Sequence, residues 1–302
     1  MSEDQRWPRA SDWLRPYAGG QSPDIVVVGV PAHQTSISKT GAHATPRAVR
    51  AALARYSTYS WSHGTDLSTL SAMDAGDVPD PDFADGEQRV ADRVHDVRPD
   101  GGLLVAIGGD NSLTYSVMSG VFDGDVSHAG LITLDAHHDL RDGVSNGSPV
   151  RRLIEAGLPG HHVVQIGIAD FSNSPEYAAR ARDLGITVVT RAALRGRAMS
   201  DVMAEALAIA GSGGGGIHVD LDVDVCDRAV VPACPAAAPG GISADDLRQA
   251  AFHAGRSPRV RSIDIAEIDA TADAADHRTV RLGALCILEA ASGLAARMQA
   301  AN

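Results

Sequence analysis

Lysine and cysteine are both scarce in this 302-residue chain, which has one lysine, Lys39, and three cysteines. A mechanism that needs a Schiff-base lysine or a phosphate-loop lysine would depend on Lys39, and its surroundings fit neither motif. Cys226, Cys234 and Cys286 lack paired spacing, so the sequence predicts neither a disulfide framework nor a zinc ribbon. The scarcity of lysine and cysteine therefore argues against Schiff-base and phosphate-loop lysine mechanisms and against a disulfide or zinc-ribbon scaffold.

Basic residues are fewer than acidic ones. The chain has 26 lysine and arginine residues and 38 aspartate and glutamate residues, which gives a net charge of −12. Such a chain is repelled by nucleic acid and by anionic membrane surfaces. The N-terminus shows no signal-peptide core, and no apolar run approaches the roughly 20 residues that a membrane-spanning helix needs. We therefore expect a soluble, cytoplasmic protein whose partner is a small-molecule substrate.

Short apolar runs rich in β-branched residues alternate with helical patterns along most of the chain. Runs of this kind are typical of strands that are buried on both faces of a parallel sheet. The alternation predicts an α/β fold with three αβα layers around a mostly parallel central sheet. No low-complexity linker interrupts residues 1–302, so we expect one domain, preceded by an irregular arm over residues 1–23. The strands are predicted at residues 25–30, 103–107, 130–134, 163–168, 186–190, 217–223 and 260–266.

Polar residues suited to chemistry follow several of these strands. In a parallel α/β sheet the carboxyl ends of the strands share one edge, where ligands bind. Carboxylates that meet there repel one another unless protons or a metal neutralise them. The candidates are Asp110, Asn111, Asp135, His137, Asp139, Asn146, Asp222, Asp224 and Glu267.

The segment Asp135–Asp139 is the most distinctive of these clusters. On an extended strand, residues i, i+2 and i+4 point to the same side, so Asp135, His137 and Asp139 would converge. Carboxylate oxygen and imidazole nitrogen together suit a divalent ion such as manganese. A strand that simply ends in a polar loop would look similar, so this cluster alone leaves both interpretations open.

Four ordered motifs carry a resemblance to a known family. The segments Gly108–Ser112, Asp135–Asp139, Asp222–Asp227 with Pro239–Gly241, and Asp264–Glu267 resemble the ureohydrolases, the superfamily of arginase, agmatinase and formimidoylglutamase. The finer segments Ser145–Arg152, Phe171–Ser174 and Pro232–Pro235 resemble bacterial formimidoylglutamases of histidine degradation. This resemblance implies hydrolysis of N-formimino-L-glutamate to L-glutamate and formamide, by a metal-activated hydroxide that attacks the amidine carbon.

The resemblance also implies two manganese sites and a homo-oligomer, either a trimer or a hexamer. One site would use Asp135, His137, Asp222 and Asp224, and the other Asp135, Asp139, Asp222 and Asn111. Most ureohydrolases have histidine where this chain has Asn111. Because an amide oxygen is a poorer ligand for manganese than imidazole, the second ion should bind more weakly.

The same comparison implies roles in catalysis and substrate binding. Glu267 would hold the cationic formimino nitrogens, and Asp139 would pass a proton to the departing nitrogen. Asn146, Arg141 and Arg151 are candidates for the carboxylate tail of the substrate, although any one arginine could instead be a solvated loop residue. Two alternatives stay open, namely a ureohydrolase acting on a guanidino substrate and a metal-poor pseudoenzyme.

Overall fold

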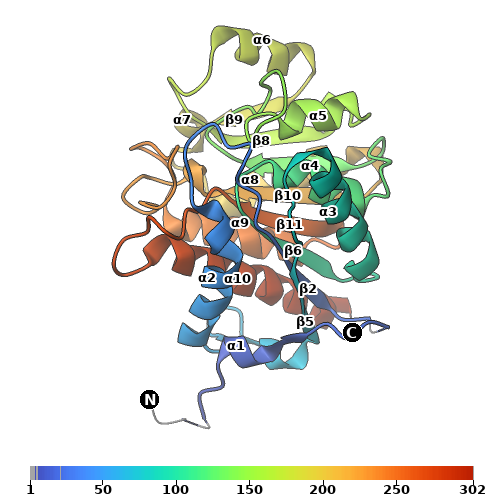
Figure 1. The fold of residues 1–302 in the computed structure, drawn as a ribbon, viewed down its shortest axis with the longest axis vertical. Coiled ribbons are helices and arrows are strands. Elements are labelled where there is room, and N and C mark those ends of the chain that lie inside the picture. Colours follow the sequence, from blue (N-terminus) through green and yellow to red (C-terminus); the bar gives the residue numbers. More distant parts are fainter. Residues whose placement is uncertain (1–3, 5, 21, 302) are drawn as a thin grey trace.

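Among the residues that the structure describes, nine strands form one central sheet in which every pairing is parallel. The computed structural model describes residues 4, 6–20 and 22–301. The strand order across the sheet is β1-β5-β2-β6-β11-β10-β7-β8-β9 (Figure 1). The bounds in chain order are β1 (Leu14–Pro16), β2 (Ile25–Val30), β5 (Ala72–Asp77), β6 (Leu103–Gly108), β7 (Gly130–Leu134), β8 (Val163–Ile168), β9 (Thr187–Thr190), β10 (Ile217–Asp222) and β11 (Val260–Ala266).

The central strands are buried on both faces, as their continuous apolar runs predict. In β2, Ile25 and Val27 belong to the hydrophobic core on one face, whereas Val26 and Val28 belong to the core on the other. This alternation follows from the two-residue repeat of a strand. A sheet with two apolar faces needs helices on both sides to exclude water.

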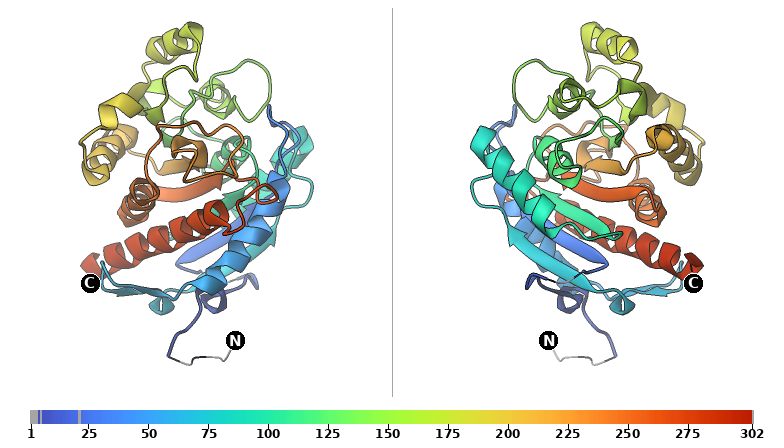
Figure 2. Two further views of the ribbon diagram at one scale, coloured as in Figure 1. Left: turned by 90° about the vertical axis from the view of Figure 1, so that its left-hand side faces the viewer. Right: turned by 90° about the vertical axis from the view of Figure 1, so that its right-hand side faces the viewer.

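Helices cover both faces and complete the expected three layers (Figures 1 and 2). One face packs against α2 (Thr45–Ala52), α8 (Met199–Ala210), α9 (Ala244–Arg256) and α10 (Arg278–Ala301). The other packs against α3 (Phe83–Val97), α4 (Leu113–Val121) and α5 (Pro149–Glu155). Near the β9 edge lie α6 (Pro175–Asp183) and α7 (Arg191–Leu194).

The region before β2 corrects the expectation of an irregular arm. It contains a short helix, α1 (Ala10–Trp13), and β1, which pairs with β5 at the edge of the sheet. Strand β5 itself was not predicted, because its sequence Ala72–Asp77 has no apolar run and only its first residue is buried. A two-stranded hairpin, β3 (Tyr59–Ser60) with β4 (Thr65–Asp66), was also missed.

Helix α10 corrects another expectation, namely that no apolar segment is long enough to cross a bilayer. Among the described residues it is the one helix that is long and apolar enough to cross a membrane, judged by length and composition only. Inside the fold, however, 78% of its most apolar window is buried, and the helix packs against α9 and α2. Such burial is typical of a core helix.

Candidate active site

Four neighbouring strands bring the candidate residues to one edge of the sheet. Strands β6, β11, β10 and β7 lie side by side, and all four run in the same direction. Asn111 follows β6, Glu267 follows β11, Asp222 ends β10 and Asp135 follows β7. The expectation that these residues share the carboxyl edge is confirmed.

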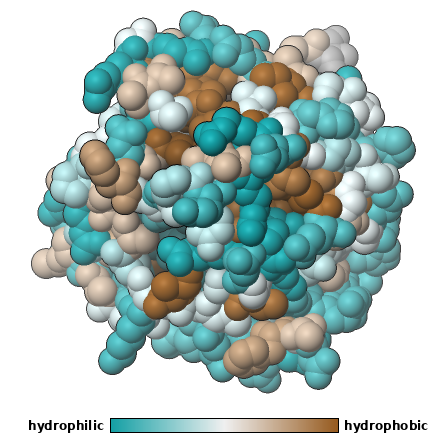
Figure 3. Space-filling model, turned by 90° about the horizontal axis from the view of Figure 1, so that it is seen from above, coloured by the Kyte–Doolittle hydropathy of each residue, from teal (hydrophilic) through white to brown (hydrophobic). Residues whose placement is uncertain are grey.

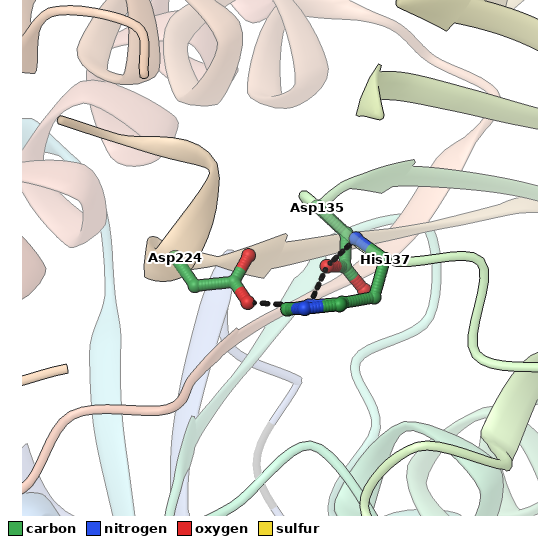
Figure 4. Close-up of side chains that lie close together, drawn as sticks. All are labelled: Asp135, His137 and Asp224. Atoms are coloured by element: carbon green, nitrogen blue, oxygen red, sulfur yellow. Dashed lines mark hydrogen bonds and ion pairs between the residues drawn. The ribbon is translucent and has the colours of Figure 1, made fainter. Parts of the chain in front are cut away.

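Asp135, His137 and Asp224 form a cluster suited to a metal ion. One ligand atom from each lies within 4.8 Å of the others. His137 Nδ1 is 2.7 Å from Asp224 Oδ2 and 3.4 Å from Asp135 Oδ1, so one ring nitrogen is close to both carboxylates (Figure 4). Both acids are buried. An imidazole nitrogen with buried carboxylate oxygens is a donor set that fits manganese.

Loops, and not alternation along a strand, bring these residues together. Strand β7 ends at Leu134, so Asp135–Asp139 lies beyond it, and Asp139 adopts a left-handed φ of 51°. Asp224 lies in a short 3-10 helix, η6 (Val223–Val225). The argument from strand periodicity was therefore wrong, because it assumed that the extended backbone continues past the apolar run.

Asn111 and Asp139 form the neighbouring part of the site. The Asn111 amide nitrogen donates to Asp139 Oδ2 at 2.7 Å and lies 3.4 Å from Asp220 Oδ2. Thr114 donates its hydroxyl to Asn111 Oδ1 at 3.0 Å. In this arrangement Asn111 presents its amide nitrogen to the carboxylates, and its role as a metal ligand stays a prediction.

The electrostatics of the site favour a bound cation. Burial, reinforced by neighbouring carboxylates, raises the pKa values of Asp135 and Asp222 well above the ordinary range. Burial also raises the pKa of Asp139 to about 7. For Asp224, burial alone would raise the pKa, but the hydrogen bond and charge of His137 lower it. Neutralising this group of acids requires protons or a metal.

The pKa of His137 is also raised, but here the charged form of the side chain is the one that the neighbouring carboxylates stabilise. Burial disfavours its charged form, but the hydrogen bond to Asp224 and the nearby carboxylates raise the pKa to about 9. The imidazole must lose this proton before its Nδ1 can bind a metal. The proton and a metal ion therefore compete for the same position.

Glu267 lies at the base of the same site, again with a left-handed φ, of 65°. Its Oε1 accepts hydrogen bonds from the backbone N–H of Asn111 at 2.8 Å and from the Asn146 amide at 2.9 Å. Burial, together with the charge of Asp110, raises the pKa of Glu267 to about 8. Asn146 also accepts from the backbone N–H of Ile37 at 3.0 Å, so it connects Glu267 to the loop after β2.

A cavity of about 370 Å³ opens above these residues. Four buried acids line it, namely Asp139, Asp222, Asp224 and Glu267, together with the partly buried His137. The other lining residues include the exposed Ile37 and Arg141, and they are completed by Ser38, His138, Leu140, Asn146, Gly147, Ser172, Asn173, Ser174, Tyr177 and Ala236. Seen from the side of α6, the surface is mostly hydrophilic, with apolar residues in separate patches (Figure 3).

The three arginines near this entrance have different surroundings. Arg141 lines the cavity, and within the described part of the chain its guanidinium makes no hydrogen bond or ion pair. Arg151 does not line it, since its guanidinium binds the carbonyls of Arg141 and Gly143 and the carboxylate of Glu155. Arg152 forms a two-bond ion pair with Glu87. Of these, Arg141 alone is placed to meet a ligand.

Supporting residues surround the site, and several were not identified from the sequence. His138 is buried, with its Nδ1 2.6 Å from Gln165 Oε1. Asn173 holds the backbone of the metal-binding stretch, because its amide contacts the Ala136 carbonyl and the His138 N–H. Thr114 could have been found from its position one helical turn after Asn111.

The fold and the site together define an αβα protein with a buried acidic and histidine centre at the carboxyl edge of its sheet. The model of the arginase family matches residues 23–293, so the chain belongs to the arginase family. This result confirms the resemblance inferred from the four motifs.

Several formimidoylglutamases are similar to this chain over most of its length. The protein from Halalkalibacterium halodurans is 34% identical, with 89% of this chain and 87% of the relative covered. The protein from Bacillus subtilis is 32% identical, with 97% and 94% covered. The crystal structure of the Bacillus subtilis formimidoylglutamase superposes with a TM-score of 0.90 at 31% identity, covering 97% of this chain and 94% of that one.

More distant structures share the fold. A Trypanosoma cruzi formiminoglutamase, in complex with Mn²⁺, has a TM-score of 0.86 at 24% identity, with 96% of this chain and 99% of that chain covered. At this identity the likeness concerns the fold alone.

Proposed function

We propose that this protein hydrolyses N-formimino-L-glutamate to L-glutamate and formamide, using manganese, as a step of histidine degradation. The observation that carries the proposal is a cavity that is lined by His137 and Asp224 of the Asp135–His137–Asp224 cluster and also by Arg141, whose guanidinium makes no hydrogen bond or ion pair with any residue that the structure describes. The relatives named formimidoylglutamase support it, because they match nearly the whole chain. An anionic substrate tail and a cationic head fit opposite ends of this cavity.

The donor set determines which residues would hold the metal. Asp135, His137, Asp222 and Asp224 would hold one ion, and Asp139 and Asn111 would complete a second, weaker site that shares Asp135 and Asp222. When bound, divalent manganese lowers the pKa of coordinated water and supplies a nucleophile near neutral pH. The backbone N–H groups that already bind these carboxylates would hold them in place for either ion.

The chain's own residues would then orient the substrate and move protons. Glu267 would accept hydrogen bonds from the formimino nitrogens, and Asn146 would keep its carboxylate in position. Asp139, held by Asn111, would pass a proton to the departing glutamate nitrogen. Arg141 would pair with a carboxylate of the tail.

We also infer that residues 1–302 act as one catalytic domain and assemble into a trimer or hexamer, which light scattering would test.

The direct test is hydrolysis by manganese-loaded protein of four compounds in parallel: N-formimino-L-glutamate, agmatine, arginine and 4-guanidinobutyrate. We expect formamide from the first compound only. Urea from a guanidino compound would overturn the substrate assignment, and the agmatinase from Gallus gallus, 30% identical over 175 residues, makes that the second candidate. No turnover of any compound by metal-loaded protein would favour a pseudoenzyme.

A further inference from the structure

The loop after the metal-binding stretch is held by side chains from two separate helices. The loop begins at Asp139, whose left-handed φ of 51° is uncommon for a residue with a side chain. The Arg141 N–H donates to the Gly147 carbonyl at 3.0 Å and closes the loop. Three of its carbonyls, those of Leu140, Arg141 and Gly143, accept from arginine side chains.

Arg151, on α5, binds two of these carbonyls. Its Nε donates to the Arg141 carbonyl at 2.6 Å, and a second nitrogen donates to the Gly143 carbonyl. Its remaining contact is with Glu155 at 2.5 Å, and its backbone N–H donates to the Asp139 carbonyl at 3.2 Å. Because these contacts occupy the guanidinium, Arg151 supports the loop from outside the cavity.

Arg180, on α6, binds the third carbonyl and also lies near Tyr177, a residue of the same helix that lines the cavity. One nitrogen donates to the Leu140 carbonyl at 2.6 Å and to Asp142 Oδ1 at 2.9 Å. The guanidinium also lies 5.5 Å from the centre of the Tyr177 ring, and Tyr177 lines the cavity. A single side chain therefore connects the loop that carries Arg141 to the helix that carries Tyr177, and both residues line the cavity.

We propose that Arg180, assisted by Arg151, is a positioning residue that sets the distance between Arg141 and the α6 wall and thereby the fit of the substrate tail. This inference rests on the proposed function for the identity of the tail. The planar guanidinium is suited to the role, because its donors have a fixed geometry that a lysine ammonium lacks. A displacement of about 1 Å in residues that position a substrate is enough to lower catalytic efficiency strongly.

The kinetic test compares Arg180→Ala, Arg180→Lys and a control, Arg182→Ala. Arg182 lies on the same helix and is exposed, and its side chain makes no hydrogen bond or ion pair with any residue that the structure describes. We expect Arg180→Ala to raise KM for N-formimino-L-glutamate about tenfold with kcat changed less than about threefold. Arg180→Lys should give an intermediate KM, and Arg182→Ala a wild-type KM.

Hydrogen exchange of the amides at residues 139–147 tests the same point without turnover. These amides should exchange faster in Arg180→Ala than in wild type or Arg182→Ala, at equal melting temperature. Unchanged exchange together with an unchanged KM in Arg180→Ala would overturn the proposal. An equal drop in kcat in Arg180→Ala and Arg182→Ala would overturn it as well. If wild-type protein fails to hydrolyse the formimino compound, the proposed substrate is wrong, and the exchange data still decide whether Arg180 holds the loop.

Discussion

Three acids of the site, Asp135, Asp222 and Asp224, each accept a hydrogen bond from a nearby backbone N–H. His137 N–H binds Asp135 at 2.6 Å, Ala136 N–H binds Asp224 at 2.9 Å, and Asp224 N–H binds Asp222 at 2.8 Å. Such bonds favour the ionised carboxylates and fix their orientation. The residues are therefore arranged for a cation by the backbone before any ion binds.

Asn111→His should increase manganese binding at the second position. In the wild type the amide of Asn111 is engaged by Asp139, Asp220 and Thr114. Imidazole is a better ligand for manganese than an amide oxygen, so we expect about tenfold tighter binding of the second ion. Isothermal titration and metal content of the purified protein measure the effect, with Asn111→Ala as control. Identical stoichiometry and affinity in wild type and Asn111→His would contradict the assignment.

At the scale of elements, glycines lie at the contact between α9 and α10. A Cβ at Gly293 of α10 would lie 2.1 Å from the Phe252 carbonyl oxygen of α9, and one at Gly255 of α9 would lie 2.0 Å from the Ala290 carbonyl oxygen of α10. Both neighbours are backbone atoms, which cannot rotate away. The pairing of α9 with α10 therefore depends on the absence of side chains at these two positions.

Gly293→Ala should destabilise the protein, whereas Gly283→Ala on the same helix should not. At Gly283 the added Cβ would meet only side-chain atoms, the nearest being Ile268 Cδ1 at 3.1 Å. Overpacking at position 293 is expected to lower the free energy of unfolding by about 1–3 kcal/mol. At position 283 the better helix propensity of alanine offsets the contact, to within about 1 kcal/mol. Urea denaturation measures both changes, and equal effects of the two substitutions would contradict the packing argument.

At the scale of the whole molecule, the active site places several acids where they are hard to ionise. Burial raises the pKa of Glu267 to about 8 and that of Asp139 to about 7. Asp224 and the other carboxylates raise the pKa of His137 to about 9. In each case the folded protein without metal holds a proton more tightly than the unfolded chain does.

The metal-free protein should therefore lose stability as pH rises. A group whose pKa is raised by folding stabilises the fold fully below its unfolded pKa and loses that effect as pH passes the folded value. For these groups the window runs from about pH 4 to about pH 9. Asp224, whose pKa is lowered, affects stability only at lower pH.

We expect a lower melting temperature at pH 8 than at pH 5.5 after chelation, and a much smaller difference with manganese. A melting temperature of chelated protein that rises over this range would show that the acids are neutralised in another way.

Part of the site was predictable because the relevant signals are local. The β-branched runs before Asn111, Asp135 and Glu267 identified the strands, and the residues after each run identified the candidates. The position of the carboxylates at one edge followed from the parallel direction of the strands. Strand β5 and α1 were missed because they have no periodic apolar pattern to detect.

The sequence alone determined the alternation of strands and helices, the acids and histidine at the strand ends, and the family to which the chain belongs. Only the tertiary structure decided that β11 and β10 lie between β6 and β7, that a loop turns Asp139 toward Asn111, and that Arg151 faces away from the cavity while Arg141 lines it. The physical reason is the range of the interactions. Burial and backbone periodicity are local properties of a sequence, whereas the partner of a long side chain depends on segments that folding brings together from distant positions.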